Sequence, residues 1–198
     1  MTIQPVILIG GKGKRLGKDK VFLSFENTLL LERTYRLFKE SFKEEPLFIG
    51  RGVLPYPYKI IPDSIPGIGP IGGLFTALTY TNKDFIFLAA CDMPFINKNL
   101  LSYMKNMLNT NVDIYIPYFD NGMIEPLFAF YNRRLISLVK EQIKIEDYKL
   151  RSLLNTASVQ FLSESEIESI DPDFLTFFNV NTKSDFEKAQ ELLSDKVR

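Results

Sequence analysis

Histidine is absent from all 198 residues of the sequence. Its absence excludes Ser-His-Asp and Cys-His nucleophilic catalysis, and it excludes every metal site built on imidazole ligands. Any chemistry must therefore use carboxylates, lysine and arginine side chains, and backbone amides.

The sequence also has one cysteine, no net charge and no long apolar run. Cys91 is the only cysteine, so no intrachain disulfide can form and we expect a cytoplasmic protein. Without a histidine to activate its thiol, Cys91 is expected to be a small buried residue. The 24 basic residues balance the 24 acidic ones, which argues against nucleic acid or a membrane surface as a partner. The longest apolar run, 85–91, is too short to cross a bilayer, and the N-terminus does not resemble a signal peptide.

Short apolar runs alternate with amphipathic helical stretches along the chain. This alternation predicts an α/β fold, a three-layer sandwich with a Rossmann-like, mostly parallel sheet, and one domain spanning residues 1–198. The turn signal Asp120-Asn121-Gly122 predicts a hairpin and hence a mixed sheet. Strands are expected near 5–10, 46–50, 59–62, 85–90, 112–117, 126–131, 157–162 and 174–179.

Cap signals place several of the helices. Thr28 is expected to cap a first helix, Asn97 a helix with an apolar face, and the capping-box-like segment from Thr182 to Asp185 the last one. Further helices are expected near 72–81, 133–142 and 150–155.

A basic glycine-rich loop, GGKGKRLGKDK at residues 10–20, follows the first expected strand. Ligands of open α/β sheets bind beyond the carboxyl ends of the strands, where this loop lies. Its glycines, among them Gly10, Gly11 and Gly13, allow consecutive backbone N–H groups to form an anion-binding nest. The five cations of the loop suit a triphosphate, and they are Lys12, Lys14, Arg15, Lys18 and Lys20.

Two familiar phosphate motifs fit this loop poorly. Asp19 follows Lys18 where a Walker A loop requires Ser or Thr. The spacing of Gly11, Gly13 and Gly17 matches a loose NADP-type loop, but such a loop opens directly into a helix, and helical signals begin later here. An NADP-dependent reductase therefore stays open as an alternative class.

Two further stretches place acidic residues at strand ends. PDSIPGIGPIGG at 62–73 puts Asp63 after a strand, and Gly72-Gly73 could bring a helix N-terminus close to an anion. In FIFLAACDMPFI at 85–96, a buried strand ends at Asp92. Mg²⁺ prefers one or two carboxylates together with phosphate oxygens, so Asp92 is the candidate metal ligand. The alternative reading of Asp92 is a helix cap or a loop-stabilising carboxylate.

Three polar residues have open roles at this stage. Asn179 and Asn181 lie two apart at an expected strand end, so both would point to one side, where they could bind a ligand or Mg²⁺. They could equally fix the turn into the last helix. Glu125, before Pro126, could line the site or be the charge of an edge strand.

A magnesium carboxylate, a cationic glycine loop and no candidate general base together suggest nucleotidyl transfer. A substrate phosphate is already anionic near neutral pH, so no histidine is needed to remove a proton. Catalysis then comes from alignment and from neutralising charge on the α-phosphate and the departing pyrophosphate, which Arg15 and Lys20 would do with the metal.

Four motifs, LIGGKGKRLGKDK, DSIPGIGPIGG, CDMPFI and NVNTKSDFEKA, follow the order and approximate spacing of the molybdenum cofactor guanylyltransferases. The chain resembles this family from Leu8 to Ala189. The resemblance implies a sheet of the nucleotide-diphospho-sugar transferase type. It also implies transfer of GMP from GTP to molybdenum-molybdopterin, which gives molybdopterin guanine dinucleotide and pyrophosphate. Molybdoenzymes or cofactor carrier proteins are implied as further partners.

The resemblance also implies roles for individual residues. Leu8, Ile9 and Gly10 would hold the guanine and ribose through main-chain groups, with Gly11 and Gly13 in the same nucleotide loop. Lys20 would contact the phosphates, Asp63 would help fix the nucleoside, and Asp92 would bind Mg²⁺. Asn179 and Asn181 match an Asn-x-Asn near the pterin or the metal.

The sequence departs from the family pattern at several positions. Ile9 replaces the usual Ala, Leu16 replaces Met, and Glu125 stands where a His commonly precedes the Pro. Gly50 falls near a position often occupied by Asn. Transfer from CTP, or to a sugar phosphate, is the nearest alternative, although the Gly10-Gly11 pair favours GTP because cytidylyl relatives typically show Ala-Ala-Gly there. A non-catalytic nucleotide-binding module is a third class.

Overall fold

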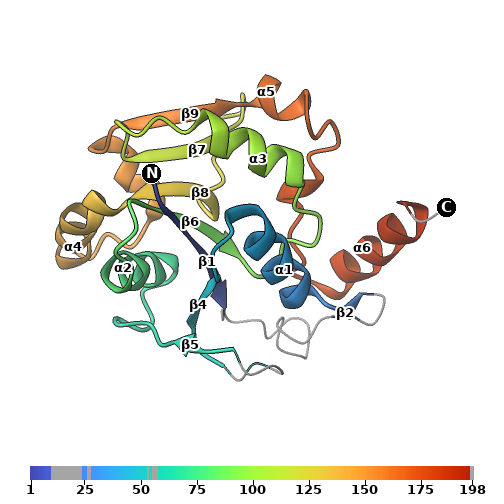
Figure 1. The fold of residues 1–198 in the computed structure, drawn as a ribbon, viewed down its shortest axis with the longest axis horizontal. Helices are drawn as coiled ribbons and strands as arrows, with labels where there is room; N and C mark the ends of the chain where they lie inside the picture. Colours follow the sequence, from blue (N-terminus) through green and yellow to red (C-terminus); the bar gives the residue numbers. More distant parts are fainter. Residues whose placement is uncertain (10–23, 26–27, 53, 55–57, 197–198) are drawn as a thin grey trace.

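A mixed seven-stranded sheet forms the centre of the computed structural model, which describes residues 1–9, 24–25, 28–52, 54 and 58–196 (Figure 1). The strand order is β5-β4-β1-β6-β8-β7-β9. The first four of these strands are parallel, and β8 is antiparallel to both neighbours. The bounds are β1 Ile3–Ile9, β4 Leu47–Gly50, β5 Ile60–Ile61, β6 Phe85–Ala90, β7 Ile114–Tyr118, β8 Phe128–Asn132 and β9 Val159–Ser163. The predicted mostly parallel, mixed sheet is confirmed.

Helices cover both faces of this sheet, as Figure 1 shows. One apolar cluster joins the sheet to α1 (Leu30–Phe42), α3 (Lys98–Met107) and α5 (Glu164–Glu168). The other joins it to α2 (Pro70–Tyr80), α4 (Ile136–Lys144) and the 3₁₀ helix η3 (Leu150–Asn155). Strand β1 alternates between the two clusters, with Ile7 in the first and Val6 in the second. The three-layer sandwich is therefore confirmed.

Strand β6 is anchored by aromatic packing. All six of its residues are buried, and the ring of Phe87 lies 4.8 to 5.4 Å, centroid to centroid, from four other rings. These rings belong to Phe38 and Phe42 of α1 and to Phe128 and Phe130 of β8. Offset and edge-to-face pairs of this kind add to the burial energy, so β6 offers a firm base for whatever follows its last residue.

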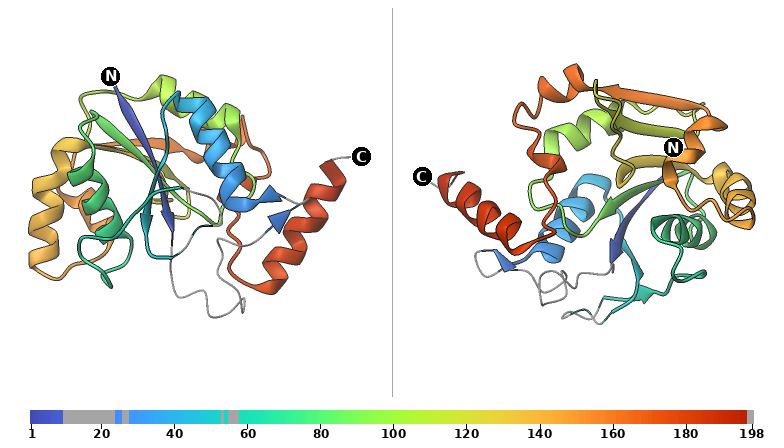
Figure 2. Two further views of the ribbon diagram at one scale, coloured as in Figure 1. Left: turned by 60° about the horizontal axis from the view of Figure 1, so that its bottom comes forward. Right: turned by 180° about the vertical axis from the view of Figure 1, so that it is seen from behind.

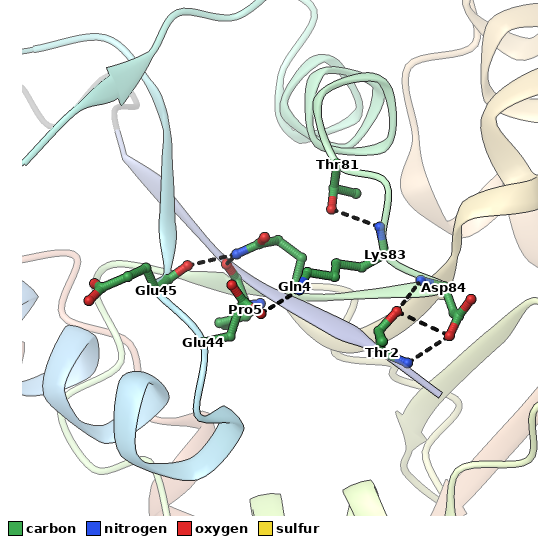
Figure 3. Close-up of polar contacts among 8 residues, drawn as sticks. All are labelled: Thr2, Gln4, Pro5, Glu44, Glu45, Thr81, Lys83 and Asp84. Carbon is green, nitrogen blue, oxygen red and sulfur yellow. Dashed lines mark hydrogen bonds and ion pairs between the residues drawn. The ribbon is translucent and has the colours of Figure 1, made fainter.

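Polar contacts fix the amino ends of β1 and β6 to each other (Figure 3). The backbone N–H of Thr2 donates to Oδ2 of Asp84 at 2.6 Å, and the N–H of Asp84 donates to Oγ1 of Thr2 at 3.1 Å. The side-chain amide of Gln4 donates to the carbonyl of Glu45 at 2.7 Å, which ties β1 to the segment before β4. These contacts set the register at the end of the sheet opposite to its carboxyl edge.

The last helix, α6 (Lys183–Lys196), stands apart from the sheet beside the short ribbon of β2 (Ser24–Phe25) and β3 (Thr28–Leu29) (Figure 2). Ala189 and Leu193 of this helix, with Val180 just before it, pack on Leu30 at the start of α1. Its capping box is confirmed, because the N–H of Thr182 donates to Oδ2 of Asp185 at 2.8 Å and the N–H of Asp185 donates to Oγ1 of Thr182 at 3.1 Å.

Two sequence predictions about elements are wrong. Thr28 does not cap α1, because it pairs in the β2–β3 ribbon and the N-cap is Leu29, without a side-chain hydrogen bond. Residues 174–179 form no strand, since Phe174 has a left-handed φ of 52° and the 3₁₀ helix η4 (Leu175–Phe177) follows it. Asp171 stabilises this bend, because its Oδ2 accepts the N–H of Thr176 at 2.9 Å.

Two further sequence-based expectations are confirmed: the burial of Cys91 and the helix cap at Asn97. Cys91 is buried, with 4% of its surface exposed. Asn97 caps α3 through its Oδ1, which accepts the N–H groups of Asn99 and Leu100. None of the helices in the described part of the chain has the length and apolar character that a membrane span requires.

A capping box at Ser163 predicts an acid-sensitive contribution to stability. The hydroxyl of Ser163 donates to Oε2 of Glu166 at 2.6 Å, and hydrogen bonding from Ser163 is the main reason why the pKa of Glu166 lies below its ordinary value of 4.5. A lowered carboxyl pKa stabilises the fold above the ordinary value, and this stabilisation is lost as the pH falls through the folded-state pKa.

We therefore expect Ser163→Ala to lower the free energy of unfolding by about 1 kcal/mol at neutral pH, and by less once Glu166 is protonated. Urea unfolding at neutral and acidic pH measures both values. Ser169→Ala is the matched control, because the Ser169 hydroxyl donates to the backbone carbonyl of Glu166, which does not titrate. A Ser163→Ala effect that is independent of pH contradicts this explanation.

Candidate active site

Four strand ends meet at the carboxyl edge of the parallel half of the sheet. Ile9 pairs with Gly50, Leu8 with Ala90, and Ile49 with Ile61, so β1, β4, β5 and β6 end side by side. This register brings together the predicted site residues Leu8, Ile9, Asp63 and Asp92. The predicted residues Gly10, Gly11, Gly13, Arg15 and Lys20 lie outside the described residues and stay predictions.

Asp92 lies in the turn directly after β6. The N–H of Cys91 donates to the carbonyl of Leu8 at 3.2 Å, which continues the pairing of β1 and β6 up to the aspartate. The Asp92 side chain is partly buried and its Oδ1 atom is fully buried, while Met93 behind it is 1% exposed. The carboxylate is thus held at the strand end by a rigid, buried backbone.

The segment that carries Asn179 and Asn181 lies beside Asp92. The N–H of Val180 donates to the backbone carbonyl of Asp92 at 2.9 Å. Because the predicted strand is absent, a period of two does not orient the two asparagines. Instead, Val180 is buried between them, Asn179 is half-buried, and Asn181 is exposed with its N–H donated to the helix cap at Asp185. The structure brings both residues to the Asp92 end of the site.

Asp63 follows β5 and is half-buried. Burial raises the pKa of its carboxyl, and the positive charge of Arg51 acts in the opposite direction. The loop after Asp63 is tied to α2, because the N–H of Ser64 donates to Oγ1 of Thr76 at 2.9 Å. Sequence reasoning missed Arg51, a cation directly after β4; its position between Gly50 and Gly52 at a strand end was the available signal.

Gly72 and Gly73 allow α2 to pack closely against the site. A Cβ atom on Gly73 would lie 2.6 Å from Cδ2 of Leu8, and one on Gly72 would lie 2.7 Å from the carbonyl oxygen of Ile65. The structure thus gives both glycines a packing role, which positions Leu8 and the loop after Asp63. Their predicted approach to an anion stays a prediction.

Glu125 lies near Asp92, on the opposite side of β6 from β1. Its Oε1 accepts the N–H of Leu127 at 3.3 Å, and the carbonyl of Leu127 accepts the N–H of Ala90 at 3.3 Å. Burial is the main cause that raises the pKa of Glu125, and the negative charge of Asp92 adds to it. Glu125 therefore lies at the same edge of the sheet as Asp92, and its role in the site stays a prediction.

The carboxylates at this edge fit a magnesium ion. Among the described residues, no group of three or more His, Cys, Asp or Glu side chains gathers into a complete protein cage for a metal. Mg²⁺ does not need such a cage, because it binds through one or two carboxylates plus phosphate oxygens and water. The hard oxygen donor of Asp92, fixed at a strand end, meets that requirement.

The fold and this arrangement of strand ends are those of an open α/β protein that binds its ligand beyond the carboxyl ends of parallel strands. More particularly, the chain belongs to the family of the MobA-like NTP transferase domain, whose model matches residues 5–161.

Known proteins similar to this chain agree with that family. The chain is 32% identical over 190 residues to the molybdenum cofactor guanylyltransferase of Syntrophotalea carbinolica, covering 92% of this chain and 88% of the relative. It is 30% identical over 198 residues to a probable molybdenum cofactor guanylyltransferase of Peptoclostridium acidaminophilum, covering 96% and 90%. A crystal structure of molybdopterin-guanine dinucleotide biosynthesis protein A from Archaeoglobus fulgidus matches with a TM-score of 0.80 at 25% identity, covering 97% of this chain and 99% of that one.

Proposed function

We propose that this protein is a cytoplasmic molybdenum cofactor guanylyltransferase. It transfers GMP from GTP to the terminal phosphate of molybdenum-molybdopterin, forming molybdopterin guanine dinucleotide and releasing pyrophosphate. The observation that carries the proposal is the meeting of Leu8, Asp63, Asp92 and the Asn179 segment at one edge, in a chain of the MobA-like family.

The nucleotide occupies the side of the site formed by β1, β4 and β5. Leu8 and Ile9, with Gly10, Gly11 and Gly13, hold the guanine and ribose through main-chain groups, and Asp63 helps to fix the nucleoside. Asp63 and Asp92 are three strand spacings apart, about 14 Å, a span that an extended nucleoside triphosphate can bridge. The triphosphate therefore runs along the strand ends towards Asp92.

Asp92 holds Mg²⁺, which neutralises charge on the phosphates when it is bound. Arg15 and Lys20 bind the phosphate oxygens and stabilise the negative charge that develops on the departing pyrophosphate. A terminal phosphate oxygen of the pterin attacks the α-phosphorus of GTP, and the bond from that phosphorus to pyrophosphate breaks. The acceptor oxygen carries no proton near neutral pH, so a protein without histidine needs no general base for this step. Asn179 and Asn181 contact the pterin side.

A cytidylyltransferase or a sugar-phosphate nucleotidyltransferase of the same fold is the second candidate. Strand order and strand-end carboxylates are compatible with either nucleotide. The Gly10-Gly11 pair favours GTP. Family membership favours NTP transfer over an NADP-dependent reductase or a non-catalytic module.

Pyrophosphate release, measured with each of the four NTPs in the presence and absence of molybdenum-loaded molybdopterin, tests the proposed function. We expect release only with GTP and only when the pterin is present, because the pterin phosphate is the attacking group. Turnover with CTP alone would assign the enzyme to the cytidylyl class. Release that needs no pterin would contradict the acceptor.

A further inference from the structure

We propose that Glu125 is the residue that recognises the acceptor, binding the paired N–H donors of a 2-amino-4-oxo-pteridine ring through its carboxylate. This inference rests on the proposed function and extends it to a position where the sequence departs from the usual His-Pro pattern.

The position of Glu125 in the fold points to the acceptor side. β8, which Glu125 precedes, is paired to β6 on the side away from β1, whereas the predicted nucleoside contacts follow β1 and β5. Asp92, at the end of β6, lies between the two sides. Because the proposed nucleoside contacts occupy the β1 side of β6, the β8 side, where Glu125 lies, is the flank that stays open to the acceptor.

The hydrogen bonds of Glu125 make it a fixed acceptor with unused capacity. Oε1 accepts the N–H of Leu127. The backbone N–H of Glu125 donates to the carbonyl of Pro117 at 3.3 Å, and its carbonyl accepts the N–H of Phe128 at 3.2 Å. In the part of the chain that the structure describes, no cation forms an ion pair with Glu125 and no other hydrogen bond reaches its carboxylate. A half-buried carboxylate with free lone pairs is stabilised by further N–H donors.

The surroundings favour a planar heterocycle over a second metal contact. Phe119, at the turn that leads to Glu125, packs on Phe177 at 5.2 Å and on Phe174 at 6.1 Å between ring centroids. This half-buried aromatic cluster joins the Glu125 turn to the segment that carries Asn179. Aromatic faces stack with flat rings and offer no ligand to Mg²⁺. A pteridine presents two adjacent N–H groups, which match the two oxygens of one carboxylate.

Glu125→Gln tests the inference with little change in shape. The amide oxygen can still accept the N–H of Leu127, but the NH₂ group then meets the N–H donors of the pterin. We expect the dissociation constant of molybdopterin, titrated without GTP and followed by pterin fluorescence, to rise about 10- to 100-fold. The KM for the pterin should rise equally, while the KM for GTP and the affinity for Mn²⁺, measured by electron paramagnetic resonance, stay unchanged.

Glu168→Gln is the matched control, because Glu168 is exposed on α5 and the same charge is removed. It should leave all four quantities at the wild-type level. If Glu125→Gln fails to fold, Glu125→Asp retains the charge on a shorter side chain, and it should still weaken molybdopterin binding without affecting GTP or Mn²⁺.

The outcomes separate this inference from the proposed function. A loss of Mn²⁺ or GTP affinity with unchanged molybdopterin binding would make Glu125 a metal or nucleotide residue and overturn the inference. Unchanged molybdopterin binding in both variants overturns it as well. Wild-type protein that binds molybdopterin but does not react with GTP would refute the proposed function alone, and wild-type protein that does not bind molybdopterin would refute both.

Discussion

Asp92→Asn is expected to reduce the rate of GMP transfer by about three orders of magnitude while leaving the fold intact. Asparagine is a neutral and much weaker magnesium ligand than a carboxylate, so the charge on the phosphates would no longer be neutralised at the strand end. The fold should persist, because the backbone carbonyl of residue 92 still accepts the N–H of Val180 and the side chain keeps its size.

Pyrophosphate release and the melting temperature, measured on the same preparation, test this expectation. Asp173→Asn is the matched control, because Asp173 is exposed and the same charge is lost away from the end of β6. Mn²⁺ binding should be lost in Asp92→Asn and retained in Asp173→Asn. A fully active Asp92→Asn enzyme would show that Asp92 does not bind the metal, and it would contradict the proposed mechanism.

Gly50→Ala is expected to destabilise the protein by about 4 kcal/mol or more, or to prevent folding. Gly50 has a φ of 141°, and a Cβ atom there would lie 1.8 Å from the carbonyl oxygen of Ile9. No side chain can relieve that overlap by rotating, because the clash involves a backbone atom. β1 and β4 would have to separate at the strand ends where we propose that the nucleotide binds.

Gly52→Ala supplies the control for this substitution. Gly52 has a nearly equal φ of 139°, but no atom of the described residues lies within 4 Å of a Cβ atom built on it. The free energy of unfolding of its alanine variant should fall only by the strain of the unusual backbone conformation, about 1 to 3 kcal/mol. Urea unfolding of the two variants therefore separates backbone strain from collision with Ile9. Equal destabilisation would mean that the strand ends adjust and that Gly50 is not essential to the edge.

Gly50 also shows where reasoning from sequence stops. The family resemblance placed Gly50 near a position often occupied by Asn, which suggests only that a side chain is missing there. The structure shows that the backbone leaves no room for any side chain. Close approach between two strands far apart in sequence depends on their register, which no local pattern of residues encodes.

Local signals were sufficient where one element determined the outcome. The apolar run 85–90 became β6 with the predicted bounds, and Asn97 and Thr182 cap the helices that follow them. The run 174–179 misled because its aromatic residues suit a strand, while the deciding contact comes from Asp171, which accepts the N–H of Thr176. The placement of Glu125 beside Asp92 likewise depends on the antiparallel pairing of β6 and β8.

The chain reverses direction between β6 and β8, which separates the proposed nucleotide side of the site from the proposed acceptor side. The parallel strands on one flank carry the residues that we propose to bind the nucleoside triphosphate, and the hairpin of β7 and β8 on the other flank carries Glu125, the proposed contact to the acceptor. If this assignment holds, mutations in the turn of that hairpin would change the acceptor without changing the nucleotide donor, because loops tolerate substitution better than the strands that they connect. On this view, the fold can gain new acceptors through changes in one loop while the nucleotide-binding side of the sheet stays the same.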